Sequence, residues 1–157
     1  MPHGIEIEEI EHRIDSALGQ LTSPLYDKYL LEHHLGERCI AHRLAIHLAE
    51  QFPDWDIDCE YNRNGDNLKE MPLSDECKAL LRTTGRVFPD IIIHKRGEEG
   101  PNLLAIELKI EGRPGEECDI AKLQGYISNI GYSCGLYVSF NSGIIDNHIA
   151  KKLLYHE

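Results

Sequence analysis

Two apolar segments joined by a turn-rich loop constrain the fold of this chain more than any other feature. Residues 87–94 and 103–110 are rich in Ile, Leu and Ala, and residues 95–102 between them contain two glycines and a proline. Short apolar runs bounded by turn residues are typical of buried strands. Two such runs separated by a short loop predict an antiparallel β-hairpin.

The spacing of apolar residues elsewhere predicts helices and further strands around this hairpin. Residues 55–61 alternate apolar and acidic side chains, which is the period-2 pattern of a strand. Residues 132–140 form another predicted strand, and because a predicted helix connects it to the hairpin, it should lie parallel to a neighbour. We therefore expect an α/β fold in which helices flank a mixed β-sheet. The predicted helices span residues 7–18, 24–35, 37–51, 75–81, 116–129 and 146–154.

The length and composition fit a single domain. The chain has 157 residues, of which 41% are hydrophobic, which is enough for a real core and too apolar for a disordered chain. Its longest apolar runs are only a few residues, so we expect no membrane span. The first residues lack the basic and apolar regions of a signal peptide, and five cysteines without a C-x-x-C pair are expected to be reduced thiols. These features predict a cytoplasmic protein.

The charge is strongly acidic and unevenly distributed. The formal net charge is −11, of which residues 1–60 carry −9 and residues 61–157 carry −2. Such acidity argues against a protein that coats nucleic acid by bulk attraction. Acidic helices in the first third of the chain instead suggest a surface for a basic protein partner or for a second copy of the chain.

Three charged residues lie at one end of the predicted hairpin. Asp90 is near the start of the first strand, and Glu107 and Lys109 are near the end of the second, two residues apart and therefore on one face. Two buried carboxylates are costly unless they are paired or bind a cation, and their oxygens suit Mg²⁺ or Mn²⁺. A neighbouring ammonium can position water for attack, so the set predicts metal-assisted phosphodiester hydrolysis. The alternative is an ordinary surface ion pair at the end of a hairpin.

Pro89-Asp90 followed by Glu107-x-Lys109 resembles the PD-(D/E)xK motif of restriction-endonuclease-like nucleases. The resemblance implies an α-β-β-β-α-β core over residues 36–140, preceded by an acidic helical extension over 1–35 and followed by a C-terminal helix over 141–157. It also implies that Asp90, Glu107 and the Leu108 carbonyl hold the metal and that Lys109 orients the attacking water.

Further positions fit the same resemblance. Family members often carry a glutamate on the first core helix, and Glu37 lies at the start of that helix here. Alternatively, Glu37 is an acidic residue at a helix N-terminus, where the helix dipole favours negative charge. Some members have a Q-x-x-x-Y motif on the next helix. Lys122 and Tyr126 occupy those two positions, with Gln124 as a substitute for the missing glutamine, and the alternative is a solvated lysine and a packed tyrosine. Arg63, in a predicted turn, is a candidate phosphate contact or a plain turn residue.

The function expected from these residues is that of a divalent-metal-dependent nuclease, acting on DNA rather than RNA. The first alternative is a catalytically weak or inactive nuclease-fold module that binds or regulates through a protein partner. The second is an interaction protein whose acidic N-terminal helices dock a basic partner or self-associate. Because the net charge is so acidic, we expect weak intrinsic DNA affinity that a partner or oligomer supplements.

Overall fold

The computed structural model describes residues 2–23, 29, 33, 36–61, 63–64, 67–68, 73–81, 88–97, 100–110, 114–140 and 149–156. These residues form a mixed α/β structure around a five-stranded sheet with the strand order β1-β4-β5-β6-β7. A two-stranded ribbon, β2-β3, is separate from it. The helical elements are η1 (Pro2–Gly4), α1 (Ile7–Leu21), α3 (Glu37–Gln51), α4 (Asp75–Leu81), α5 (Glu116–Gly125) and the π-helical turn η2 (Tyr126–Ile130). The strands are β1 (Asp56–Cys59), β2 (Arg63–Asn64), β3 (Asn67–Leu68), β4 (Ile91–His94), β5 (Asn102–Ile110), β6 (Tyr132–Phe140) and β7 (Ile149–Tyr155).

The central hairpin and the parallel strand beside it are confirmed. Strands β4 and β5 pair antiparallel, with Ile91 opposite Ile106 and Ile93 opposite Leu104. Strand β6 pairs parallel with β5, as the predicted helical crossover requires. The edge strands β1 and β7 pair antiparallel with β4 and β6, so the sheet is mixed.

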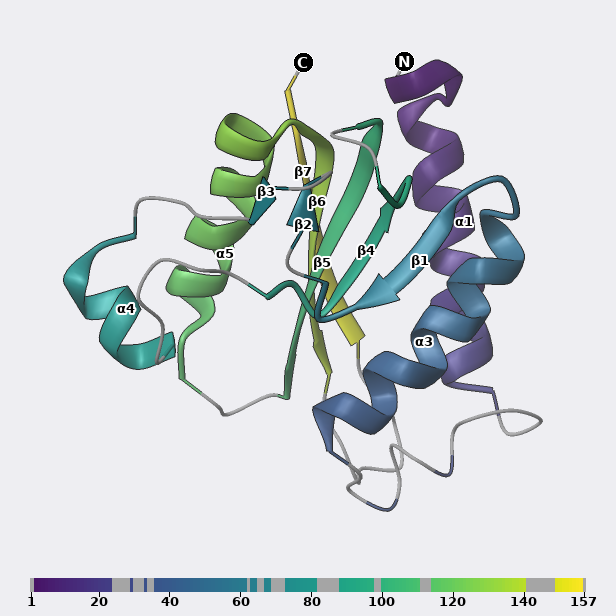
Figure 1. Cartoon of the computed structure of the whole chain (residues 1–157). Helices are drawn as coiled ribbons and strands as arrows, with labels where there is room; N and C mark the ends of the chain where they lie inside the picture. The colour runs from purple at the N-terminus through teal and green to yellow at the C-terminus, as the bar shows by residue number, and fades with distance from the viewer. Residues whose placement is uncertain are drawn as a thin grey trace.

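Helices cover both faces of this sheet. Figure 1 shows α1 and α3 on one side of the strands and α5, with α4 beyond it, on the other. Alternation along β5 divides its side chains between these layers. Leu104, Ile106 and Leu108 join the larger apolar core under α1 and α3. Ala105 lies on the α5 face, in the smaller core with Tyr126, and Glu107 follows it on that face.

The prediction for the C-terminal segment is wrong. Residues 149–155 form strand β7 rather than part of a helix over 146–154, and residues 146–148 lie outside the described part of the chain. Strand β6 would otherwise have an unpaired edge, and β7 supplies backbone partners along it. Ile149 and Leu153 both pack on the larger core. Residues four apart lie on one face of a strand as well as of a helix, so this apolar spacing does not distinguish the two.

Smaller differences concern the ends of elements. Helix α1 continues past Gly19 to Leu21, and β4 begins at Ile91 rather than at residue 87. The helix predicted over residues 24–35 lies almost entirely outside the described residues. None of the described helices is long and apolar enough to cross a membrane.

Two cysteines also differ from the prediction. Cys77 in α4 and Cys118 in α5 form a disulfide, so the expectation of five reduced thiols is wrong for this pair. The two residues are 41 positions apart, and only the packing of α4 against α5 brings them together. The other three cysteines, Cys39, Cys59 and Cys134, are free thiols.

Candidate functional site

Asp90 and Glu107 lie side by side where β4 begins. Because Ile91 pairs with Ile106, Asp90 stands opposite Glu107 on the α5 face of the sheet. The Asp90 carboxylate accepts a hydrogen bond of 2.7 Å from the Leu108 backbone N–H. The structure therefore brings Asp90 close to Glu107, and Leu108 contacts Asp90 through its N–H, whereas the resemblance implies a role for its carbonyl.

Glu107 is buried and paired with Lys122 of α5. Glu107 Oε1 lies 2.8 Å from Lys122 Nζ, and the two side chains are only 4% and 10% exposed. Burial raises the pKa of Glu107 well above its ordinary value; Lys122 opposes this rise, and the neighbouring Asp90 adds to it. Burial also raises the pKa of Asp90, although the Leu108 N–H and Lys122 oppose that rise. Both carboxylates are thus held where ionisation depends on a nearby cation.

Lys122 keeps its proton in this environment. Burial opposes the charged form of its amine, but Glu107, Asp90 and Asp119 outweigh burial and raise the pKa of Lys122. The lysine that takes the first position of the expected Q-x-x-x-Y motif therefore lies inside the site as an ammonium.

Lys109 is turned toward the first turn of α5. Its Nζ lies 2.8 Å from Asp119 Oδ2 and donates a hydrogen bond of 3.3 Å to the Pro114 carbonyl. Asp119 was not identified from the sequence, although its three-residue spacing from Lys122 places both on one face of the helix. That spacing, on a helix directly after the E-x-K strand, is the signal that could have found it.

Glu37 approaches the same end of the sheet from α3. Its Oε1 accepts a hydrogen bond of 3.2 Å from the backbone N–H of Ile110 at the end of β5. Glu37 and Asp90 both line a cavity of about 400 Å³ between the start of α3 and the end of β1. The other lining residues are Arg38, Ala41, His42, Cys59 and Glu60.

The carboxylates around Asp90 and Glu107 are the residues that a metal site here would have to use. Among the described residues, no group of three or more His, Cys, Asp or Glu side chains could hold a metal ion as they stand. Glu37, Asp90, Glu107 and Asp119 make separate contacts at this end of the sheet, and together with Lys109 and Lys122 they carry a net charge of −2 when all are ionised. Carboxylate and carbonyl oxygens are what Mg²⁺ and Mn²⁺ prefer, and one such ion would balance that charge.

The remaining candidates are placed less favourably. Tyr126 is fully buried and packs edge-on against Tyr132, with ring centroids 5.7 Å apart, so it belongs to the core under α5. Burial raises the pKa of its hydroxyl well above the ordinary value, and Glu107 adds to the rise. Gln124 is exposed and lines a different cavity beside β7. The side chain of Arg63 lies outside the described part of the structure.

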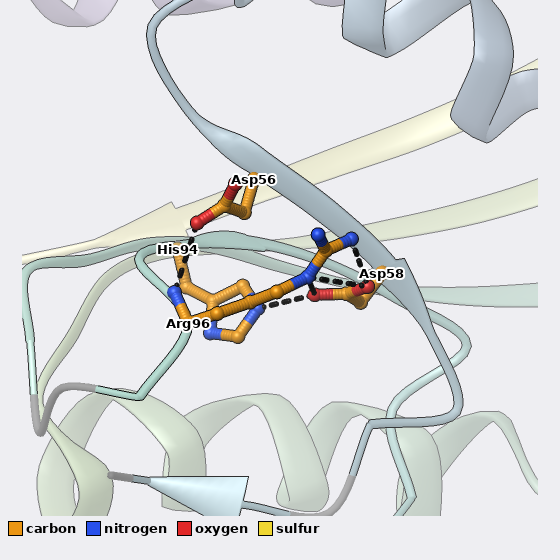
Figure 2. A network of polar contacts seen from close by, with 4 residues as sticks. All are labelled: Asp56, Asp58, His94 and Arg96. Carbon is orange, nitrogen blue, oxygen red and sulfur yellow. Dashed lines mark hydrogen bonds and ion pairs between the residues drawn. The ribbon is translucent and has the colours of Figure 1, made fainter.

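A second polar cluster lies at the other end of β4 (Figure 2). Asp58 of β1 accepts hydrogen bonds from the Arg96 guanidinium and lies 2.7 Å from Nε2 of the buried His94. Asp56 accepts the Arg96 backbone N–H at 2.9 Å. These contacts attach the loop after β4 to the edge strand β1, so we assign the cluster a structural role.

Comparison of the chain with protein-family models, with curated proteins and with solved structures finds no match. The case for a function therefore depends on the residues and geometry described above.

Proposed function

We propose that the protein is a divalent-metal-dependent nuclease of the PD-(D/E)xK class that hydrolyses phosphodiester bonds, in DNA rather than RNA. The observation that carries the proposal is the placement of Asp90 and Glu107 opposite each other at one end of a buried hairpin, with Lys109 on the same face. Buried carboxylates with raised pKa values beside a cavity are typical of functional sites.

The order of elements supports the same class. Along the chain, α3, β1, β4, β5, α5 and β6 follow the order α-β-β-β-α-β, with the small ribbon and α4 inserted between β1 and β4. Asp90 directly precedes β4 and Glu107 lies in β5, which supports the resemblance.

Each residue has a distinct role in this proposal. The carboxylates of Asp90 and Glu107 and the Leu108 carbonyl would hold Mg²⁺ or Mn²⁺, and Glu37 would reach the ion or its water. The bound ion supplies Lewis-acid activation of the phosphate and lowers the pKa of water. Lys109 would orient the attacking water and offset charge in the transition state, and Lys122 would contact the substrate phosphate.

The cytoplasm is the proposed compartment, and a partner is part of the proposal. The exposed acidic residues of α1 repel a phosphate backbone, so a basic protein partner or a second copy would supplement DNA binding. The Cys77–Cys118 disulfide counts against a reducing compartment, and alkylation of thiols in intact cells would test whether the bond forms there.

The test is cleavage of plasmid, single-stranded DNA and RNA in the presence of Mg²⁺. We expect Asp90→Asn to lower the rate at least about a hundredfold, because it removes one charged ligand and keeps the shape of the side chain. Asp54→Asn, at an exposed position, is the matched control and should cleave like the wild type. Equal cleavage by the wild type and Asp90→Asn would refute the assignment.

The same geometry also supports the catalytically weak or inactive module that acts through a partner. Glu107 and Lys109 are both neutralised by α5 side chains, at 2.8 Å in each case. Calorimetry with Mn²⁺ separates the two functions. The nuclease should bind Mn²⁺ and lose that binding in Glu107→Gln, whereas absent or Glu107-independent binding favours the module.

A further inference from the structure

Four charged side chains form a crossed arrangement between β5 and α5. On the strand, Glu107 and Lys109 are two residues apart, and on the helix, Asp119 and Lys122 are three apart, so each pair shares a face. The acidic residue of each element pairs with the basic residue of the other, and both ion pairs measure 2.8 Å. Each lysine is thereby assigned to one carboxylate.

We propose that Asp119 is a positioning residue for Lys109: its buried carboxylate holds the Lys109 ammonium against the first turn of α5 and keeps it off Glu107. This inference rests on the proposed function in so far as it gives Lys109 a part in the reaction. Lys122 already contacts Glu107 at 2.8 Å, and a second ammonium there would compete further with a cation for that carboxylate. Asp119 therefore holds Lys109 away from Glu107 and near the place proposed for the reacting water.

The residues around Lys109 enclose its ammonium group. The Asp119 side chain is 5% exposed and that of Lys109 is 15% exposed, so water competes little for their contact. The Pro114 carbonyl accepts a hydrogen bond from Nζ. Gly115, with φ at +108°, would place a Cβ atom 3.5 Å from Nζ if it were another residue. The turn before α5 thus closes around the ammonium.

The negative charge of Asp119 is what should hold Lys109 in this position. Asp119→Asn keeps the size of the side chain and removes its negative charge. Glu107, two residues before Lys109 on the same strand face, is then a carboxylate within reach of its ammonium. Lys109 should leave its position, either for Glu107 or for solvent.

The first measurement needs neither metal nor substrate. Metal-free protein is treated with an amine-acylating ester, and labelling of each lysine is followed by peptide mass spectrometry. Asp119→Asn should label Lys109 about tenfold faster than the wild type, because the ammonium loses the charged partner 2.8 Å away. Glu117→Gln, an exposed change of the same charge on the same helix turn, should leave the labelling unchanged. Unchanged labelling in Asp119→Asn would overturn the inference.

The second measurement separates a positioning role from a purely structural pair. In DNA cleavage, Asp119→Asn should lower kcat about tenfold or more with little change in KM, and Asp119→Glu should restore most of it. Faster labelling with unchanged kcat would overturn the positioning role and leave a structural ion pair. If the wild type does not cleave DNA, the proposed function fails, and the labelling result still decides whether Asp119 holds Lys109. Should Asp119→Asn not fold, Asp119→Ser, also polar and smaller, replaces it in both measurements.

Discussion

The pair between Glu107 and Lys122 allows a quantitative test of how the site is built. Lys122→Met keeps a long, flexible side chain of similar volume and removes the ammonium. Glu107 then remains buried with a side-chain exposure of 4% and loses the cation 2.8 Å away. The substitution therefore isolates the cost of an uncompensated buried carboxylate.

The expected loss at pH 8 is about 3 to 5 kcal/mol of unfolding free energy, the usual cost of removing one partner of a buried ion pair. In a domain of this size that corresponds to a fall in Tm of about 6 to 20 °C. Urea unfolding of the wild type and Lys122→Met, followed by circular dichroism, measures the difference directly.

The pH dependence gives the prediction its sign. The folded-state pKa of Glu107 is raised, so the burial penalty develops as pH rises above the unfolded value of about 4.3 and is complete above the folded value. Below about pH 4 the carboxyl is protonated in both states, and the difference between Lys122→Met and the wild type should shrink toward zero. There the wild type still buries an ammonium, so the order of stability can reverse.

Together with the single variant Glu107→Gln, the double variant Glu107→Gln/Lys122→Met completes a thermodynamic cycle. With both charges removed, its stability should return to within about 2 kcal/mol of the wild type or exceed it. A loss below about 1 kcal/mol for Lys122→Met at pH 8, or a loss that does not change between pH 4 and pH 8, would refute the reasoning that Glu107 is buried and ionised against Lys122.

Three further predictions concern other parts of the fold. Cys77→Ser should lower the unfolding free energy by about 4 kcal/mol in urea titrations, the value for a cross-link that spans 41 residues. A dithiol reductant should lower the unfolding free energy of the wild type by the same amount and leave that of the variant unchanged. Burial opposes ionisation of Asp58, but hydrogen bonds from the neighbouring arginine and histidine outweigh burial and lower the pKa of Asp58. Asp58 thus contributes stability that is present above about pH 3.9 and lost as pH falls through its folded-state pKa. In acid unfolding, Asp58→Asn should lack this pH-dependent loss of stability. Gly135→Ala should cost about 1 to 3 kcal/mol by thermal unfolding, because its Cβ atom would lie 3.1 Å from a side-chain carbon of α5, and a Tm equal to that of the wild type would show that the helix shifts freely.

Local patterns were enough to predict the hairpin and the residues that meet at its end. Alternation along residues 103–110 places Glu107 and Lys109 on one face, and antiparallel pairing places Asp90 opposite Glu107. The parallel pairing of β6 followed from the helical connection, because a parallel neighbour needs a crossover. These are consequences of chain geometry over a few residues, and they did not depend on the rest of the fold.

Features that depend on tertiary packing were missed. The apolar residues of the C-terminal segment fit a helix or a strand equally well, and the free edge of β6 decided in favour of β7. The disulfide between Cys77 and Cys118 depends on how α4 lies against α5. The contact between Lys109 and Asp119 depends on how α5 is rotated over the sheet, which helical spacing alone cannot give.

The acidic residues of the chain are divided between the N-terminal helices and the candidate site. Exposed carboxylates of the N-terminal third include Glu8 and Glu9 on α1, which covers the sheet face opposite α5 (Figure 1). Of the candidate-site carboxylates, Glu107 and Asp119 lie between β5 and α5, where Lys122 and Lys109 already neutralise them, whereas Glu37 approaches from α3. A divalent cation would balance the remaining net charge of that group, so the site could approach a phosphate backbone without a large local repulsion. The net charge of −11 then weakens the overall attraction to nucleic acid without opposing the proposed chemistry at the site. If so, neutralising α1 carboxylates should raise the rate of DNA cleavage and leave its dependence on Mg²⁺ concentration unchanged.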